Sequence, residues 1–357
     1  MQKTYKKYFL AANSCEGFVS YFDSSYRTSD GWRAYIIKGG PGTGKSSLMK
    51  YITSVAGEKG YDTELCVCSS DPMSLDGVII RDKKTVLLDG TSPHIVEPKY
   101  PGAVEEIINL GQFWNSDILS KREKEIIAVT KKNKSLHKRA SRYLLAAGEL
   151  LKDNFKIAAN CCDENKIKKY AQVTCEKYIP KRDKTGNREI RFLSGITPEG
   201  IITYVKTVTA FCKNVVVTED KFGAVSNVFM QTAENIALSN GYDVIVLKNP
   251  FLPSKITDHI IIPELSLCFA REYDYAHFET ENRKIHSRRF TDLTKLHQNK
   301  SRLSFNRRLS AELLQNACFT LNAAKSVHDE LEKYYVDAMN FSAAAQYGID
   351  LAKKIFS

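Results

Sequence analysis

Residues 39–46 read Gly-Gly-Pro-Gly-Thr-Gly-Lys-Ser, and this stretch decides the fold. It fits the pattern G-x-x-x-x-G-K-[ST], in which backbone N–H groups wrap phosphate oxygens and the lysine reaches the β/γ-phosphates. Residues 34–38 before it are apolar and β-prone, whereas residues 46–58 after it carry apolar side chains at helical spacing. The sequence therefore predicts a strand, a phosphate-binding loop and a helix, in this order.

A second predicted strand contributes to the same site. Thr85–Asp89 (TVLLD) is hydrophobic and ends in aspartate, a form that helps to hold Mg²⁺ beside such a loop. We expect Lys45 to neutralise phosphate charge, and Ser46 and Asp89 to hold the metal. The alternative role of Asp89 is that of a turn residue before Gly90. The residues expected to contact nucleotide are Gly39, Gly40, Pro41, Gly42, Thr43, Gly44, Lys45, Ser46 and Ser47.

Length and composition indicate a globular protein of two domains. The chain has 357 residues, of which 43% are hydrophobic and 26% charged. No apolar run approaches the roughly 18 residues of a membrane span, and the N-terminal apolar stretch is too short for a signal peptide. Nine cysteines, without two CxxC pairs, favour reduced thiols over a zinc site. We therefore expect a cytoplasmic protein.

The chain contains an internal repeat. Gly60-Tyr61-Asp62 reappears as Gly241-Tyr242-Asp243, and further identities follow at the same shift of 181 residues. Slightly upstream the shift is 183, as in Glu16-Gly17 and Glu199-Gly200. Agreement in order over about seventy residues predicts two homologous lobes.

The second copy has lost the phosphate-binding residues. Asp220, Val225, Ser226 and Asn227 align with Gly39, Gly44, Lys45 and Ser46, and Ala270 aligns with Asp89. The lysine and two glycines are gone, and an acidic residue at the start of the turn repels an anion. We expect this lobe to be a degenerate partner and not a second catalytic site.

Each lobe continues into a helical segment. Apolar residues recur in steps of three and four from Ile126 to Leu150, and again from Leu314 to Tyr335, with His328 on the seam. This pattern favours an intramolecular helical subdomain over an oligomerisation coil. The expected N-terminal lobe is 1–182, helical over about 104–178, and the C-terminal lobe is 183–357, helical over about 309–356. The predicted fold class is α/β, with two P-loop-like lobes, each with a parallel-sheet core.

Several residues are candidates for the reacting end of the site. Asp71 and Asp76 follow the strand at 64–68, so either would position water or a substrate hydroxyl, or serve only as turn and cap residues. Thr91 and His94 follow Asp89 and are candidates to sense the γ-phosphate. Arg33 and Arg81 are candidate charge stabilisers.

Basic residues gather in one segment of a chain whose net charge is +11. Residues 281–308 hold nine Lys or Arg against Glu281 and Asp292, with Phe290 and Phe305 between them. This segment fits contact with nucleic acid or an acidic partner, contact with a triphosphate in the first lobe, or a solvated connector.

The segments KGGPGTGKSSLMK, CSSDPMSLDGVII, LLDGTSPH and PGAVEEIINLG, followed by ITPEGI, resemble a family of bacterial duplicated P-loop ATPases. The resemblance covers nearly the whole chain and implies ATP and Mg²⁺ as ligands of Gly39, Gly44, Lys45, Ser46 and Asp89. It also implies two P-loop-type lobes with helical insertions. One intact loop beside one eroded copy makes an ATPase, a hydrolase with one active site in the first lobe, the leading hypothesis. Two alternatives remain: a small-molecule or nucleotide kinase, and a nucleotide-gated module that binds nucleic acid.

Overall fold

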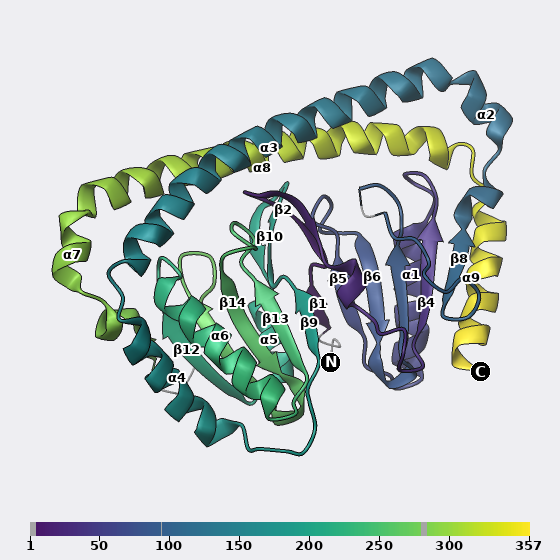
Figure 1. Cartoon of the computed structure of the whole chain (residues 1–357). Helices are drawn as coiled ribbons and strands as arrows, with labels where there is room; N and C mark the ends of the chain where they lie inside the picture. Colours follow the sequence, from purple (N-terminus) through teal and green to yellow (C-terminus); the bar gives the residue numbers. More distant parts are fainter. Residues whose placement is uncertain (1–4, 94, 280–283) are drawn as a thin grey trace.

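The computed structural model describes residues 5–93, 95–279 and 284–357. It is a mixed α/β structure, as expected, with two six-stranded sheets, a smaller four-stranded sheet, and two long helices that run side by side across the molecule (Figure 1). Within these ranges, no helix is both long and apolar enough to cross a membrane.

The N-terminal sheet has the order β1-β5-β6-β7-β4-β8. Its strands are β1 (Lys6–Tyr8), β4 (Arg33–Lys38), β5 (Glu64–Val67), β6 (Leu75–Ile80), β7 (Thr85–Asp89) and β8 (Glu105–Asn109). Strand β6 pairs antiparallel with β5 and β7, whereas the other neighbours pair in parallel. The expected parallel core is therefore wrong in this detail, because the tight connection through the short 3₁₀ helix η2 (Arg81–Lys83) reverses the chain between β6 and β7.

The C-terminal sheet repeats this order strand for strand. Read from its other edge, it runs β9-β13-β14-β15-β12-β16, and β14 is again the antiparallel member. Its strands are β9 (Arg188–Arg191), β12 (Asn214–Glu219), β13 (Val244–Lys248), β14 (Thr257–Ile262), β15 (Leu267–Glu272) and β16 (Ile285–His286). The residue just before β7 and the residue just before β15 both have a left-handed backbone conformation: Lys84 (φ 46°) and Ser266 (φ 47°).

A four-stranded antiparallel sheet joins the two lobes. Its order is β11-β10-β2-β3, built from β2 (Ala11–Ser14), β3 (Gly17–Ser20), β10 (Ser194–Thr197) and β11 (Gly200–Thr203). Each lobe thus completes its own six-stranded sheet, and strand sharing between lobes takes place in this third sheet.

The helices also occur in matching pairs. Those of the first lobe are α1 (Lys45–Glu58), α2 (Ser116–Lys121), α3 (Glu123–Ala159) and α4 (Glu164–Tyr178), with η1 (Phe22–Ser24) and η3 (Leu110–Phe113). Those of the second are α5 (Val205–Phe211), α6 (Ala224–Ser239), α7 (Leu293–Gln298), α8 (Lys300–Val336) and α9 (Phe341–Phe356), with η4 (Pro263–Leu265) and η5 (Ser287–Phe290). The region expected to be helical from about 104 begins instead with strand β8, and the second helical region begins at Lys300, before the expected 309.

Helices α3 and α8 run antiparallel along each other (Figure 1). Asn133 donates its side-chain N–H to the Ala324 carbonyl (2.8 Å) near one end, and Asn154 reaches the Leu303 carbonyl (3.4 Å) near the other. After this crossing, α4 packs on α6 of the C-terminal sheet, and α9 packs on α1 of the N-terminal sheet. The two lobes therefore exchange their last helices.

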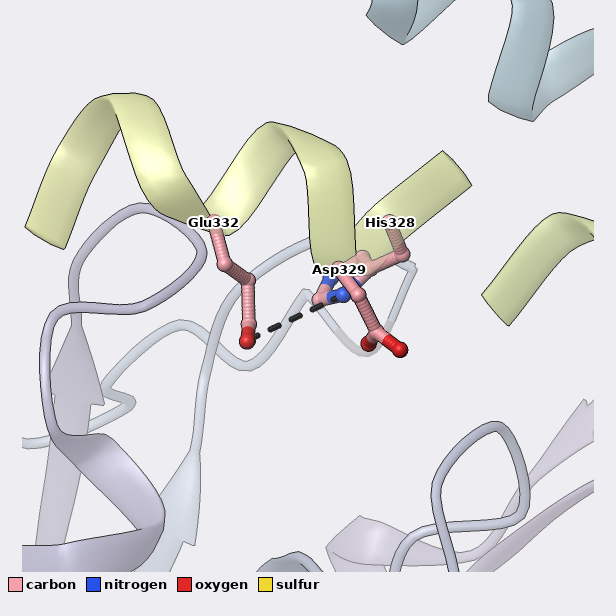
Figure 2. Close-up of side chains that lie close together, drawn as sticks. All are labelled: His328, Asp329 and Glu332. Carbon is pink, nitrogen blue, oxygen red and sulfur yellow. Dashed lines mark ion pairs between the residues drawn. The ribbon is translucent and has the colours of Figure 1, made fainter. Parts of the chain in front are cut away.

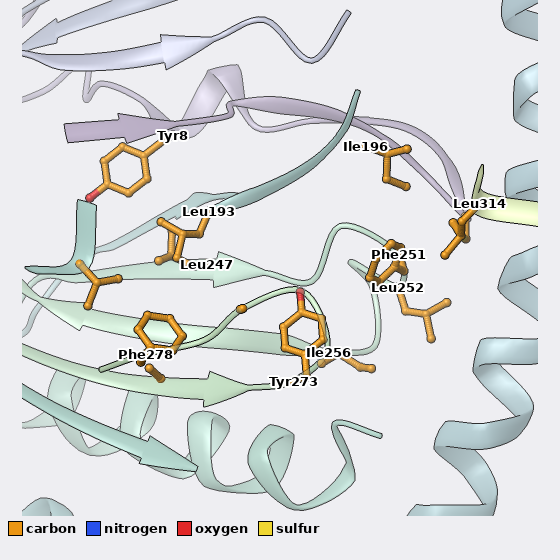
Figure 3. Close-up of a cluster of buried hydrophobic side chains, with 14 of the residues drawn as sticks. Tyr8, Leu193, Ile196, Leu247, Phe251, Leu252, Ile256, Tyr273, Phe278 and Leu314 are labelled. Atoms are coloured by element: carbon orange, nitrogen blue, oxygen red, sulfur yellow. The ribbon is translucent and has the colours of Figure 1, made fainter. Parts of the chain in front are cut away.

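Several buried apolar clusters also contain side chains from both lobes. One cluster joins Tyr8 of β1, Leu247 of β13 and Leu314 of α8, and includes aromatic side chains such as Phe278 (Figure 3). A second joins the N-terminal sheet and α1 to the last turns of α9, including Phe356. One cluster on the N-terminal sheet, around Trp32 and Ile36, comes from its own segment alone. The other face of that sheet, and the C-terminal sheet, also bury side chains from the other half of the chain.

Candidate functional site

The loop of residues 39–44 connects β4 to α1, as the sequence predicts. Gly42 (φ 66°) and Gly44 (φ 87°) adopt left-handed conformations, and Gly44 is the N-cap of α1. A side chain at either position is strained, so the glycines allow the loop to turn sharply into the helix. The first turn of α1 consequently points its backbone N–H groups back toward the loop.

The backbone N–H groups of this loop are available to donate hydrogen bonds. In the part of the chain that the structure describes, the backbone N–H groups from Gly42 to Ser46 have no hydrogen-bond acceptor. Unpaired N–H groups at a helix N-terminus carry partial positive charge and bind anions. The loop therefore offers a row of donors suited to phosphate oxygens.

The Lys45 ammonium lies beside this row. It donates to the carbonyls of Gly40 (2.8 Å) and Gly39 (3.2 Å), and it lies 3.7 Å from a carboxylate oxygen of Asp89. The parallel pairing of β4 and β7 sets Asp89 opposite Ile37, at the carboxyl edge of the sheet. Lys45 and Asp89, predicted from separate motifs, are thus brought together.

The hydroxyls around this pair have defined partners. Ser46 Oγ accepts from the Leu75 N–H (3.0 Å), and Asp89 accepts from the N–H (2.9 Å) and hydroxyl (2.5 Å) of Thr91. Thr91 therefore orients Asp89. Ser47 is exposed on α1, and His94 lies outside the described residues.

The two candidate aspartates after β5 lie in different environments. The Asp71 side chain is 30% exposed, accepts from the Ser74 hydroxyl (2.6 Å), and lies 3.8 Å from the Lys325 ammonium. Asp76 is part of β6 and is buried. Burial, with the Asp76 charge as the next cause, raises the pKa of the Cys68 thiol well above its usual value. Only Asp71 is placed where a substrate group has access.

The end of α8 lies against the phosphate loop. A Cβ added to Gly40 would lie 2.7 Å from the Tyr335 ring, and one added to Gly42 would lie 2.9 Å from the Glu332 carbonyl oxygen. These two glycines are therefore required by packing as well as by loop geometry. No motif in the sequence marks Tyr335 or Glu332, because their role depends on the return of α8 from the C-terminal lobe.

A polar cluster stands on the same part of α8. Figure 2 shows His328 and Asp329 side by side on α8 and Glu332 one turn further along, with His328 Nδ1 3.7 Å from a Glu332 carboxylate oxygen. Their ligand atoms lie within 4.8 Å of one another, but the Lys325 ammonium already pairs with Asp329 at 3.0 Å. Because this cation neutralises part of the cluster, we assign it no metal. His328 is a partly exposed residue at the rim of the helical seam.

The structure places the candidate arginines elsewhere. Arg33 begins β4 and donates to the Ala103 carbonyl (2.6 Å), at the strand end remote from the loop. Arg81 follows β6 and forms ion pairs with Glu64 and Glu189, each at 2.7 Å. Both arginines lie at the strand ends remote from the loop, so neither stabilises charge at the candidate site.

The corresponding loop of the second lobe is shorter and closed. It spans only residues 220–223 before α6 begins. Its Asp220 carboxylate accepts from the backbone N–H (2.8 Å) and hydroxyl (3.0 Å) of Ser226, in the first turn of that helix. A carboxylate of the chain itself therefore takes the place at the helix N-terminus that suits an anion.

The residue that corresponds to Asp89 is Arg271, and the expected match with Ala270 is wrong. Strand pairing sets Arg271 opposite Thr218, as Asp89 is opposite Ile37, because the repeat shift grows from 181 to 182 between the two strands. The Arg271 guanidinium donates to the carbonyls of Asp220 (2.8 Å) and Lys221 (2.9 Å). Lys45 makes the equivalent contacts in the first lobe.

The basic segment lies far from this site. Its described part runs through β16, η5 and α7 into the first turns of α8, whereas the loop contacts the last turns of α8. At 1.5 Å per residue, the distance along α8 from Lys300 to Glu332 is about 48 Å. The expectation that this segment reaches a triphosphate in the first lobe is therefore wrong. Glu281 and Arg283 lie outside the described residues.

Comparisons with protein-family models, curated proteins and solved structures find no match for this chain.

Proposed function

We propose that the first lobe binds a nucleoside triphosphate, ATP, together with Mg²⁺, and hydrolyses it. The observation that carries this proposal is the Lys45 ammonium, held beside a row of open N–H donors and 3.7 Å from Asp89. An electropositive loop next to a carboxylate at a strand end is the arrangement that a metal–triphosphate requires.

The residues present fit both ligands. The N–H groups of Gly42 to Ser46 are free to donate to phosphate oxygens, and Lys45 can exchange its carbonyl partners for the β/γ-phosphates. Ser46 and Asp89 supply the oxygen ligands that Mg²⁺ prefers. When bound, the metal would neutralise charge on the transferred phosphoryl group.

The proposed reaction also needs a group that orients the attacking water. Gly90 follows Asp89, where many ATP hydrolases carry glutamate. Asp71 lies at the same edge of the sheet and is partly exposed, so we assign it this positioning role. The buried Asp76 is left with a structural role.

We further propose that the two lobes arose by duplication of one P-loop-like unit. The identical strand orders and the paired helices support this origin. In the second lobe, Asp220 and Arg271 satisfy the loop internally, which supports a structural or regulatory role without nucleotide.

The test is nucleotide binding by the purified chain. Lys45→Ala is expected to weaken Mg-ATP binding by at least about tenfold and to abolish phosphate release, because one charge-assisted contact contributes about 1.5–3 kcal/mol. Lys59→Ala, at the other end of α1, is the matched control and should leave both unchanged. Equal ATP binding by the two variants would refute the proposal.

Phosphate transfer to a small molecule is the second candidate, favoured by the exposure of Asp71. ATP labelled on the γ-phosphate, incubated with a metabolite mixture, then yields a labelled organic product, and Asp71→Asn removes it. Label found only in inorganic phosphate favours hydrolysis.

Contact with nucleic acid is a third candidate for the basic segment. Phe305 is 52% exposed beside Lys300 and Arg308, at a shallow hollow of about 440 Å³. Binding of single-stranded RNA or DNA that weakens steeply with salt would support this contact, and binding that is absent would exclude it.

A further inference from the structure

A cavity of about 630 Å³ opens between α3 and the C-terminal lobe, away from the phosphate loop. Its lining residues are Cys15, Glu16, Leu145, Lys152, Phe155, Lys156, Ser254 and Lys255. This volume lies within the range of pockets that hold small molecules. None of its residues takes part in the proposed nucleotide site.

The charge of the cavity is positive. Its single carboxylate, Glu16, accepts hydrogen bonds from the N–H (2.9 Å) and hydroxyl (2.7 Å) of Ser254. Lys152 is paired with the exposed Glu149 at 3.0 Å. Among the described residues, Lys156 and Lys255 have no ion-pair partner, so two ammonium groups are free to meet an anion.

Another part of the cavity lining is apolar. Leu145 is 47% exposed although it lies on the long helix beside the buried Leu144, and Phe155 and Cys15 extend the apolar surface inward. An apolar wall next to free ammonium groups matches a ligand that has an anionic head and a hydrophobic body.

The repeat supports a functional reading of this face. Helices α3 and α8 both have 37 residues. When they are aligned by their first residues, Phe155 corresponds to Glu332 and Lys152 to Asp329. Phe155, which lines the cavity, thus corresponds to Glu332, whose carbonyl lies against the phosphate loop.

We propose that this cavity binds a small amphipathic anion, with its carboxylate or phosphate on Lys156 and Lys255 and its apolar part on Leu145 and Phe155. The second lobe, whose phosphate loop is closed by Asp220, has then kept a ligand site at a different place. This site does not depend on the proposed nucleotide activity.

The test uses 8-anilinonaphthalene-1-sulfonate, a fluorescent anion with an aromatic body, titrated into the full-length protein. Saturable binding is expected, and Lys156→Glu with Lys255→Glu should weaken it by about tenfold or more. Lys131→Glu with Lys138→Glu, exposed on the same helix outside the cavity, is the matched control. Leu145→Asp tests the apolar wall and should also weaken binding.

Competition identifies the head group. Displacement by octanoate indicates a carboxylate, displacement by octyl phosphate indicates a phosphate, and octanol should displace far less probe. The proposal is wrong if both double variants bind the probe like the original protein, if binding does not saturate, or if octanol competes as well as the anions. Circular dichroism of each variant confirms that the chain is folded.

Discussion

At the scale of single residues, the two loops satisfy the same carbonyl groups with cations from different places. Lys45 comes from the helix that follows its loop, whereas Arg271 comes from the neighbouring strand. Sequence alignment shows only that the lysine is missing, because the replacement charge sits about 45 residues later in the chain. The second lobe therefore carries the corresponding charge on a strand and not on the helix after the loop.

Arg271→Met should destabilise the protein strongly. The Arg271 guanidinium is buried and forms an ion pair with the buried Asp258 at 2.8 Å, so its removal leaves a buried charge without its cation. We expect a loss of about 3–5 kcal/mol in the free energy of unfolding, measured in urea at pH 7. Lys45→Met, at a longer ion pair (3.7 Å) whose side chains are each 13% exposed, should cost less, about 1–2 kcal/mol. Equal losses would show that Arg271 does not hold the loop together.

A buried ion-pair network between the lobes predicts a pH dependence. Burial alone would raise the pKa of Glu64, but the Arg191 and Arg81 charges outweigh it and lower the pKa from 4.5 to about 2. A lowered pKa in the folded state gives stability that is present above pH 4.5 and is lost as the pH falls toward 2. This contribution corresponds to about 3 kcal/mol.

Glu64→Gln tests that contribution. It should lower stability at pH 7 by about 3–5 kcal/mol and flatten the fall in stability between pH 4.5 and 2. The comparison is Asp62→Asn, at an exposed ion pair with Lys6 (3.4 Å), which should change stability by less than about 1 kcal/mol. Thermal unfolding followed by circular dichroism across this pH range measures both. An unchanged pH slope in Glu64→Gln would assign the acid sensitivity to other groups.

At the scale of elements, the sequence predicted what local patterns determine. Strands β4 and β7, the loop between β4 and α1, and the start of that helix lie within one residue of expectation, because apolar runs and glycines mark them directly. The sequence did not predict that β6 is antiparallel or that α8 returns to the first lobe. Both depend on contacts between segments far apart in the chain, to which single-sequence periodicity is blind. For this reason Lys325 was missed, and Tyr335 was expected only as a residue of the helical seam.

The contact between α8 and the phosphate loop can be measured by a double-mutant cycle. Gly40→Ala places a methyl group 2.7 Å from a ring carbon of Tyr335, so we expect a loss of about 1–3 kcal/mol from overpacking. In a Tyr335→Ala background, the same change should cost much less, because the ring is absent. Urea unfolding of the four proteins gives the coupling energy. A coupling near zero would mean that α8 does not press on the loop.

At the scale of the whole molecule, the exchanged helices make the two lobes interdependent. Helix α3 leaves the first lobe so that α4 covers α6, and α8 returns so that α9 covers α1 (Figure 1). The apolar cluster around α1 includes Leu351, Ile355 and Phe356 from the C-terminal end of the chain. The sequence predicted two lobes joined at about residue 182, but a domain in sequence is not here a unit with its own complete core.

The separated halves should therefore not fold as independent units. The fragment 1–182 lacks α9, and 183–357 lacks α4, so each exposes an apolar face that the other half covers. We expect neither fragment alone to unfold cooperatively, whereas the two co-expressed should copurify and unfold with a single transition near that of the intact chain. The control is the full-length chain cut at a protease site inserted after Arg182, which should stay assembled because the helices have already crossed. If fragment 1–182 alone unfolds at the same urea concentration as the intact chain, the exchange of helices contributes no stability, and the lobes are independent domains after all.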